Sequence, residues 1–231
     1  MLIGLKHRFI FIANTKSAST TIEHHLQRSA EIAIRHQAYG KHWPASTIEQ
    51  VFGPYFQKAG VKPESLFRFG VIRDPVEWLV SWFNYRQRPE LDANSPRSCR
   101  GVDFDDFVAE IRKGRDARDF ASLSSQGRRF LDQNGDLAVD YLVAYPRVVC
   151  EVDAIAKHMG LNVTGDMTTL TRNQSPRVQS TNRIESEIDT VIRDWYAQDQ
   201  ELYEKALGYG FGDLADVIER KYPLSAEPDG N

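Results

Sequence analysis

The chain alternates short, mostly apolar runs with longer segments whose apolar residues recur at helical spacing. Three of the runs predict strands that are buried on both faces, as in a parallel sheet: residues 8–13, 66–72 and 139–145. Each run is followed by a segment that predicts a helix. Strands that alternate with helices predict an α/β fold, here a three-layer domain with a mainly parallel central sheet flanked by helices.

Capping residues and apolar stripes define the first predicted helices. After the first strand, Ser17 or Ser19 is placed to cap a helix whose inner face carries Ile22, Leu26 and Ala30 or Ala33. After the second strand, Asp74 and Pro75 have the order of an N-cap followed by proline at the first helical position. The apolar stripe of that helix consists of Trp78, Leu79, Trp82 and Phe83.

The remaining elements are shorter or interrupted. Residues 102–114 predict a helix that ends at Gly114, and the third strand leads into a helix closed by Gly160. A last helical face, interrupted at Gln198 and Asp199, carries Ile184, Ile188, Val191, Trp195, Leu202 and Leu207. Residues 86–100 predict a surface loop. We expect one domain over residues 1–223 and a disordered tail over residues 224–231.

Composition narrows the class of protein. The 231 residues are 41% hydrophobic, which is enough for one sizeable core. The 29 basic and 32 acidic side chains give a net charge of -3, which argues against a general nucleic-acid or anionic-membrane binder, so any anion site is local. Cys99 and Cys150 have neither metal-ligand spacing nor the pattern of a disulfide framework. With no apolar run of membrane length, we expect a cytoplasmic protein without a membrane span.

The first strand-to-helix junction, residues 14–21 (NTKSASTT), has the chemistry of an anion site. Ligands of parallel sheets bind beyond the carboxyl ends of the strands, where a helix directs its free N–H groups. Lys16 adds a positive charge there, and hydroxyl donors come from Ser17, Ser19, Thr20 and Thr21. The segment lacks the glycines of a Walker A loop, which disfavours ordinary ATP or GTP hydrolysis. Alternatively, these residues only cap the helix.

A second junction supports the anion-site interpretation. Arg73 ends the second strand, and Ser81 lies eight residues later, about two helical turns into the next element. An arginine binds a phosphate through two hydrogen bonds, and a serine on the helix face adds a third. Two separate anion sites indicate a ligand with two separated phosphate groups.

The two junctions, TKSASTT and VIRDPVEWLVSWFNYR, resemble the paired signatures of sulfotransferases that use 3′-phosphoadenosine 5′-phosphosulfate (PAPS). The resemblance is greatest to the carbohydrate-type and bacterial branches and extends to GKHWPASTIEQVFG, RNQSPR and YAQDQELYEKALGYG. It implies a P-loop-like fold with PAPS as co-substrate. The loop with Lys16, Ser17, Ala18, Ser19, Thr20 and Thr21 would hold the 5′-phosphosulfate, and Arg73 with Ser81 the 3′-phosphate. The chain departs from the family pattern at Thr15, Ala18 and Pro146, where proline, glycine and glutamate are usual.

Sulfuryl transfer needs charge stabilisation on the leaving oxygen and a base for the acceptor hydroxyl, and no metal in principle. Lys16 is the residue predicted to stabilise the negative charge on the leaving oxygen. The first candidate for the base is His42 in GKHW, and competing candidates lie in the helix after the loop: Glu23, His24 and His25.

Further residues have less specific predictions. Arg172, with Asn173, Ser175 and Arg177, would close over the nucleotide or the acceptor, or else belongs to an ordinary polar loop. Arg86 and Arg88 would attract an anionic sugar, or else are solvated. The four tryptophans are predicted to lie in the core or in the wall of a pocket: Trp43, Trp78, Trp82 and Trp195.

The sequence therefore predicts a sulfotransferase that acts on a hydroxyl of a carbohydrate or glycosylated metabolite. Two alternatives stay open. One is a non-catalytic module that binds PAPS or its bisphosphate product, PAP. The other is a P-loop kinase for a small metabolite, which the missing Walker A glycines disfavour.

Overall fold

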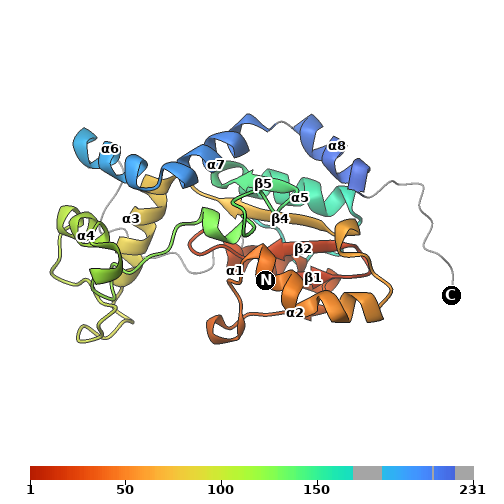
Figure 1. The fold of residues 1–231 in the computed structure, drawn as a ribbon, viewed down its shortest axis with the longest axis horizontal. Coiled ribbons are helices and arrows are strands. Elements are labelled where there is room, and N and C mark those ends of the chain that lie inside the picture. The colour runs from red at the N-terminus through yellow and green to blue at the C-terminus, as the bar shows by residue number, and fades with distance from the viewer. Residues whose placement is uncertain (169–183, 210, 222–231) are drawn as a thin grey trace.

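The computed structural model of the chain describes residues 1–168, 184–209 and 211–221. The strands are β1 (Leu2–Gly4), β2 (Phe9–Ile12), β3 (Ile32–Ala33), β4 (Phe67–Ile72) and β5 (Tyr141–Ala144). The helices are α1 (Ser19–Leu26), α2 (Ala45–Lys58), α3 (Pro75–Arg86), α4 (Phe104–Ile111), α5 (Val148–His158), α6 (Ser186–Trp195), α7 (Ala197–Gly208) and α8 (Phe211–Lys221). Figure 1 shows their arrangement.

The strands form one mixed sheet in the order β3-β1-β2-β4-β5. The predicted strands β2, β4 and β5 run parallel to one another, whereas β1 is antiparallel to both β2 and β3. The α/β fold is therefore confirmed, with a five-stranded sheet flanked by helices. The pattern missed β1 and β3, which are three and two residues long and too short to show a period.

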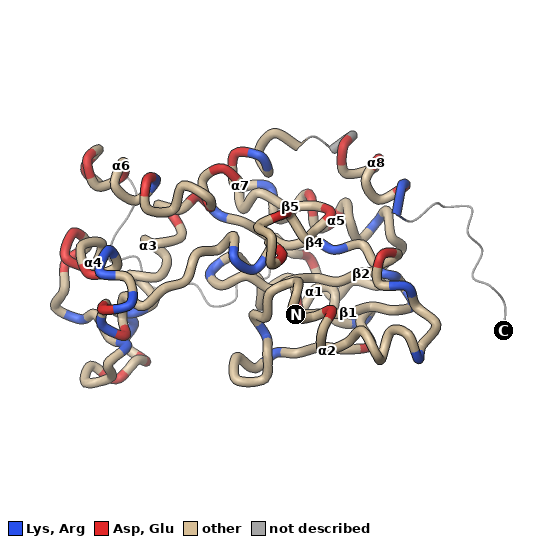
Figure 2. The backbone as a smooth tube through the Cα atoms, in the orientation of Figure 1, with Lys and Arg blue, Asp and Glu red and all other residues tan. Residues whose placement is uncertain are grey.

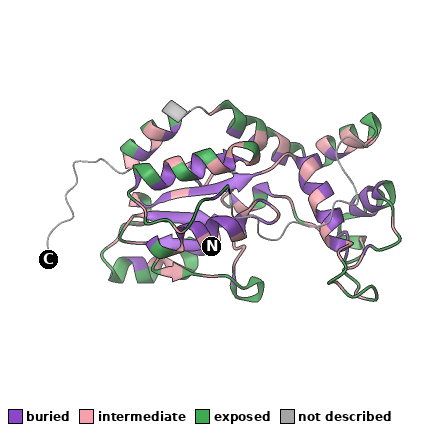
Figure 3. Cartoon of the chain, turned by 180° about the vertical axis from the view of Figure 1, so that it is seen from behind, coloured by how far each residue is buried: buried purple, intermediate pink, exposed green. Residues whose placement is uncertain are grey.

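The parallel strands are buried on both faces, as their apolar sequences predicted. Every residue of β2 and β5 is buried, and the central strands are buried along their length in Figure 3. In β4, Gly70 lies directly under the ring of Phe130, and a Cβ there would come within 2.3 Å of that ring. This close approach explains a glycine inside a strand.

Apolar side chains gather in two clusters. One surrounds the sheet, and the other joins α3, α4 and α6. In Figure 1 these three helices lie together at the end of the molecule away from the strands, while α7 runs beside β5. The predicted stripe on α3 faces into the second cluster, and so do the buried apolar residues of α4. The helix α3 begins as predicted, because the Asp74 carboxylate accepts hydrogen bonds from the amides of Val76 and Glu77.

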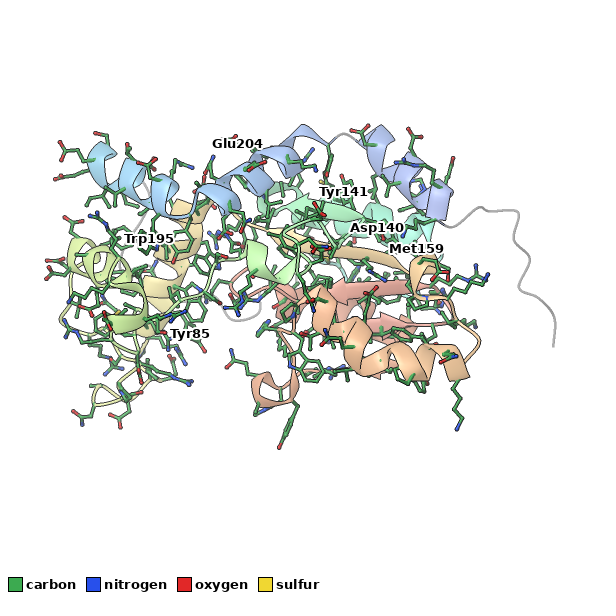
Figure 4. All side chains as sticks on the ribbon, in the orientation of Figure 1. Tyr85, Asp140, Tyr141, Met159, Trp195 and Glu204 are labelled. Carbon is green, nitrogen blue, oxygen red and sulfur yellow. The ribbon has the colours of Figure 1, made fainter. Side chains whose placement is uncertain are left out.

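The C-terminal helical segment differs from its prediction. It divides at Tyr196 into α6 and α7, so its apolar positions do not form one continuous helical face. Trp195 and Leu207 are 50% and 45% exposed, and the prediction that Trp195 belongs to the core or a pocket wall was wrong (Figure 4 labels Trp195). The predicted interruption at Asp199 has a structural reason. Its carboxylate is fully buried and accepts the amides of Gln126 and Gly127, both at 2.7 Å.

Charges and thiols are distributed without a dominant feature. Lys and Arg positions are interspersed with Asp and Glu positions over most elements (Figure 2). Cys99 is buried, Cys150 is exposed, and both are free thiols. Within the described ranges, no cluster of side chains suits a metal ion, and none of the helices there is both long and apolar enough to cross a bilayer.

Candidate functional site

The carboxyl ends of β2 and β4 bring the two predicted anion-binding junctions together. Ile12, the last residue of β2, pairs with Gly70 of β4, so the loop after β2 starts beside the carboxyl end of β4. Buried Asn14 fixes the loop there, because its side-chain amide donates to the Val71 carbonyl (3.1 Å) and to the side-chain oxygen of Gln126 (3.0 Å). The same Gln126 oxygen accepts the backbone amide of Arg73 at 3.1 Å.

The loop between β2 and α1 has a distinct backbone conformation. Lys16 and Ala18 both have positive φ, +57° and +59°. The prediction that Ser17 or Ser19 caps α1 was wrong. Ala18 is the N-cap and makes no side-chain cap bond, while the Ser17 hydroxyl donates to the Asn14 carbonyl. The first N–H groups of α1 are left without helix carbonyls, which suits an anion at this end.

The helix α1 is also shorter than predicted. It ends at Leu26 and is followed by a 3-10 turn over Gln27–Ser29 and by β3, so Ala30 and Ala33 do not belong to its inner face. Ile22 and Leu26 are fully buried, as predicted. The helix therefore has just over two turns with which to place the loop against the sheet.

Ala18→Gly is expected to stabilise the protein. Alanine in the left-handed region costs roughly 1–2 kcal/mol, and the added freedom of glycine in the unfolded chain costs ~0.4–1 kcal/mol. The free energy of unfolding in urea should therefore rise by about 0.5–1 kcal/mol. Ala93→Gly, at an exposed loop position outside the positive-φ residues, should lower it. A loss in both variants would show that Ala18 is not strained.

The side chain of Lys16 lies in a cationic environment. Its Nζ is 4.2 Å from the ring centre of Tyr85, which projects from α3 on the side toward the sheet (Figure 4). Arg88 stacks on the same ring, with Cζ 3.5 Å from its centre. Burial, followed by the charges of Arg73, Arg88 and Arg86, lowers the pKa of Lys16 to about 8. A negatively charged ligand would relieve this repulsion.

Arg73 lies between the loop and α3. Its Nη1 donates to the Lys16 carbonyl at 3.5 Å, its Nε contacts the Glu77 carboxylate at 3.1 Å, and its Cζ lies 4.3 Å from the ring centre of Tyr145. Ser81 is half-buried, and it lies four residues from both Glu77 and Tyr85, so the three share one face of α3. Arg73 contacts Glu77 at one end of this face, and Lys16 contacts Tyr85 at the other end.

The other predicted hydroxyls lie in the first turn of α1. Ser19 and Thr21 are buried, with 7% of each exposed. The Thr20 hydroxyl accepts a hydrogen bond from Lys41 at 3.3 Å. These positions surround the open end of the helix, and Lys41 adds a further positive charge beside it.

His42 lies on the other side of the loop. Its Nδ1 is 2.7 Å from the Ala13 carbonyl, so Nδ1 carries the proton and Nε2 has the free lone pair. Burial, opposed by this hydrogen bond, lowers its pKa to about 4. The ring is therefore neutral at physiological pH, in the tautomer that accepts a proton at Nε2.

A cavity of about 300 Å³ adjoins the loop and His42. Its walls come from both apolar clusters and from the segment before Gln126. The lining residues are Thr15, Gln37, His42, Trp43, Trp78, Trp82, Arg86, Ser122, Leu123, Ser124 and Arg129. The pocket-wall prediction is confirmed for Trp43, Trp78 and Trp82. Trp78 also links the cavity to the loop, since its indole N–H donates to the Thr15 carbonyl at 3.0 Å.

The sequence profile of the sulfotransferase family matches residues 1–206. The chain belongs to the sulfotransferase family. No curated protein and no solved structure matches it. The family consists of enzymes that use PAPS as donor, so this sulfotransferase has a nucleotide donor and an acceptor, and the match gives no support to a kinase.

The competing base candidates lie farther from this cavity. Glu23 is buried in ion pairs with the Met1 amine and Lys41. His25 contacts Asp153 at 3.0 Å and lines a separate hollow on α5. His24 is half-buried on α1. Of the four candidates, only His42 is among the residues that line the cavity beside the loop.

Sequence reasoning missed several residues that shape the site. Asn14 and Gln126 position both junctions but carry no motif signal apart from a polar residue directly after a strand. Arg129 lines the cavity, and Arg86, which was singled out only as a possible attractor of anionic sugars, is buried in its wall. Arg172, predicted to bind the nucleotide, lies outside the described residues, as does the whole RNQSPR segment.

Proposed function

We propose that this sulfotransferase moves the sulfuryl group of PAPS to a hydroxyl of a carbohydrate or glycosylated metabolite, with Lys16, Arg73 and His42 in the roles given below. One observation carries the proposal: Lys16 and Arg73 follow neighbouring parallel strands, and Arg73 Nη1 lies 3.5 Å from the Lys16 carbonyl. Two cations thus meet at the edge of the sheet where ligands bind.

In the proposal, the donor spans both junctions. The open end of α1 binds the 5′-phosphosulfate through backbone N–H groups, Lys16 and the hydroxyls of the loop. Arg73 and Ser81 bind the 3′-phosphate, and Arg172 joins them. Glu77 positions the Arg73 guanidinium through its 3.1 Å contact while leaving the remaining N–H groups of the fork for phosphate.

The transfer step then follows from the charges. The acceptor oxygen attacks sulfur in line, the bond from sulfur to the bridging phosphate oxygen breaks, and the 5′-phosphate of PAP leaves with the negative charge. Lys16 stabilises that charge by donating a hydrogen bond to the leaving oxygen. His42 Nε2 takes the proton of the acceptor hydroxyl, and its Nδ1–H stays bonded to Ala13.

The proposal of a carbohydrate acceptor is supported by the resemblance to the carbohydrate-type branch of the family and by the residues of the cavity wall. Three indole rings line the cavity beside His42. Flat aromatic faces pack against the apolar face of a sugar ring as they do against other rings. The cytoplasmic location stays a prediction from composition.

The test combines donor binding with transfer. Calorimetry with PAP should show one site, and radiolabelled PAPS with a panel of sugars, phenols and alcohols should give labelled product. Binding without product for any acceptor would favour the non-catalytic module, for which Ala18 and Thr15 are the relevant departures. Preference for ATP with magnesium over PAP would contradict the proposal and favour the kinase.

We expect a bell-shaped pH profile for kcat/KM, which reports the ionisations of the free enzyme. His42 must be neutral, so activity falls as the pH drops through about 4. Lys16 must be protonated, so activity falls as the pH rises through about 8. In Lys16→Arg the alkaline limb should disappear, because a guanidinium stays charged. An alkaline limb that persists in this variant would assign it to another group.

A further inference from the structure

Two arginines in the cavity wall have no acidic partner. Arg86 is 9% exposed, and its Nε atom and that of Arg129 are buried without a hydrogen-bond acceptor. Across the described ranges, neither side chain forms an ion pair. Arg129 donates from Nη1 to the Ser125 carbonyl at 3.2 Å, and the Arg86 guanidinium lies 4.9 Å from the ring centre of Trp82.

Four other partly buried arginines have carboxylates within contact distance: Arg68 with Glu49, Arg73 with Glu77, Arg147 with Glu151 and Arg193 with Asp74. Arg88 instead stacks on the Tyr85 ring and donates to the Tyr85 carbonyl. Burial lowers the pKa of Arg129, and the charge of Asp199 opposes this effect without reversing it. The two carboxylate oxygens of Asp199 accept the amides of Gln126 and Gly127. A charge withdrawn from water without a partner is costly, so buried Arg86 and half-buried Arg129 in one cavity indicate that a ligand supplies the counter-charge.

The other residues of the cavity wall indicate which groups the ligand has besides its negative charge. The indoles of Trp43, Trp78 and Trp82 offer flat apolar surface, Ser122 and Ser124 offer hydroxyls, and His42 stands at the same cavity. A volume of about 300 Å³ accommodates a small molecule or the terminal unit of a larger one. The cavity therefore suits a compound that combines an anionic group, a ring with an apolar face and a hydroxyl.

We propose that the acceptor is a hydroxylated acid whose carboxylate is held by Arg86 and Arg129, whose ring packs against the tryptophans, and whose hydroxyl reaches His42. This inference rests on the proposed function and specifies its acceptor. Both a sugar acid and an aromatic hydroxy acid have this chemistry. The donor's phosphates are assigned to Lys16 and Arg73. Arg86 ends α3, about 16 Å along the helix axis from its start beside Arg73, and it is near enough to Lys16 for its charge to lower the pKa of that lysine, which places the acceptor pocket next to the phosphosulfate end of the donor.

The experiment compares acids with neutral analogues of the same shape. The pairs are 4-hydroxybenzoate with 4-hydroxybenzamide, and methyl glucuronide with methyl glucoside. With labelled PAPS, kcat/KM should favour the acid of at least one pair by about 10-fold or more, the effect of a charge-assisted hydrogen bond. The pair that shows the preference identifies the source of the acid.

Two arginine variants make the test specific. Arg86→Gln and Arg129→Gln should each reduce the ratio of kcat/KM for the acid to kcat/KM for the neutral analogue by about 10-fold. The matched controls are Arg28→Gln and Arg115→Gln, which remove the same charge at exposed positions outside the cavity and should leave the preference unchanged. Thermal unfolding confirms that each variant is folded.

The outcomes separate this inference from the donor assignment. PAP binding by the unmodified protein with equal use of acid and neutral analogues overturns the inference and leaves the proposed function standing. Loss of PAP affinity in Arg86→Gln as large as in Arg73→Gln also overturns it, because the arginine would then serve the donor. If no product forms, binding of the acids to PAP-saturated protein is measured by calorimetry. The inference is overturned if none of the acids binds.

Discussion

Lys16→Met is expected to lower kcat by about 10²–10³-fold, the effect of removing one donor from a developing oxyanion. Methionine has a similar length and is apolar, so it fits a site where burial already lowers the pKa of the lysine. The fold should persist, with thermal stability equal to or above that of the unmodified protein. The measurement is single-turnover transfer from radiolabelled PAPS at saturating donor.

Two controls accompany this variant. Lys58→Met removes the same group from the exposed end of α2 and should leave turnover unchanged. PAP affinity should fall less in Lys16→Met than kcat does, because the lysine interacts most strongly with the charge that appears as the bond breaks. Equal losses in affinity and in kcat/KM, with kcat unchanged, would make Lys16 a binding residue and contradict its role at the leaving oxygen.

His42→Asn is expected to lower kcat by about 10²–10⁴-fold, the usual contribution of a positioned general base. Asparagine can still donate to the Ala13 carbonyl in place of Nδ1, so the loop should keep its geometry while the proton acceptor is lost. Donor affinity should stay within about threefold, since the ring lies on the acceptor side. Turnover and PAP binding are measured on the same preparation.

A second histidine, His25, serves as the control for His42. His25→Asn changes a buried histidine on α1 that contacts Asp153 in a separate hollow, and turnover should survive. Near-normal turnover in His42→Asn together with loss of turnover in Lys16→Met would place the base elsewhere. Glu23 is a weak replacement, because the Met1 amine and Lys41 already occupy its carboxylate.

The parts of the fold that could be predicted are those encoded by neighbouring residues. The apolar runs of β2, β4 and β5, and the Asp74-Pro75 start of α3, each show their structure within a few positions. The two candidate anion-binding junctions were visible for the same reason, since Arg73 directly follows β4 and Lys16 lies in the loop after β2. The left-handed conformation of Ala18 was not visible, because local propensity favours the neighbouring serines as caps.

The rest depends on residues that are distant in sequence. Gln126 and Asp199 look like ordinary polar residues, and only the packing of α7 against β5 buries them beside the loop. Arg86 ends an amphipathic helix, where an arginine is expected to be solvated, and it is buried because Trp82 and the 86–100 loop cover it. Burial of a charge is a tertiary property that periodicity does not report.

The side-chain amide of Gln126 touches both junctions: its oxygen accepts from Asn14 and from the Arg73 amide, and its nitrogen donates to the Arg73 carbonyl at 2.8 Å. One buried group therefore fixes the gap between the two cations before any nucleotide arrives, and little reorganisation is needed on binding. In the proposed binding mode, a molecule with a single chain of phosphates at one end of the ribose would engage only one of the two cations. Gln126 would then contribute to discrimination against such molecules without contacting the nucleotide.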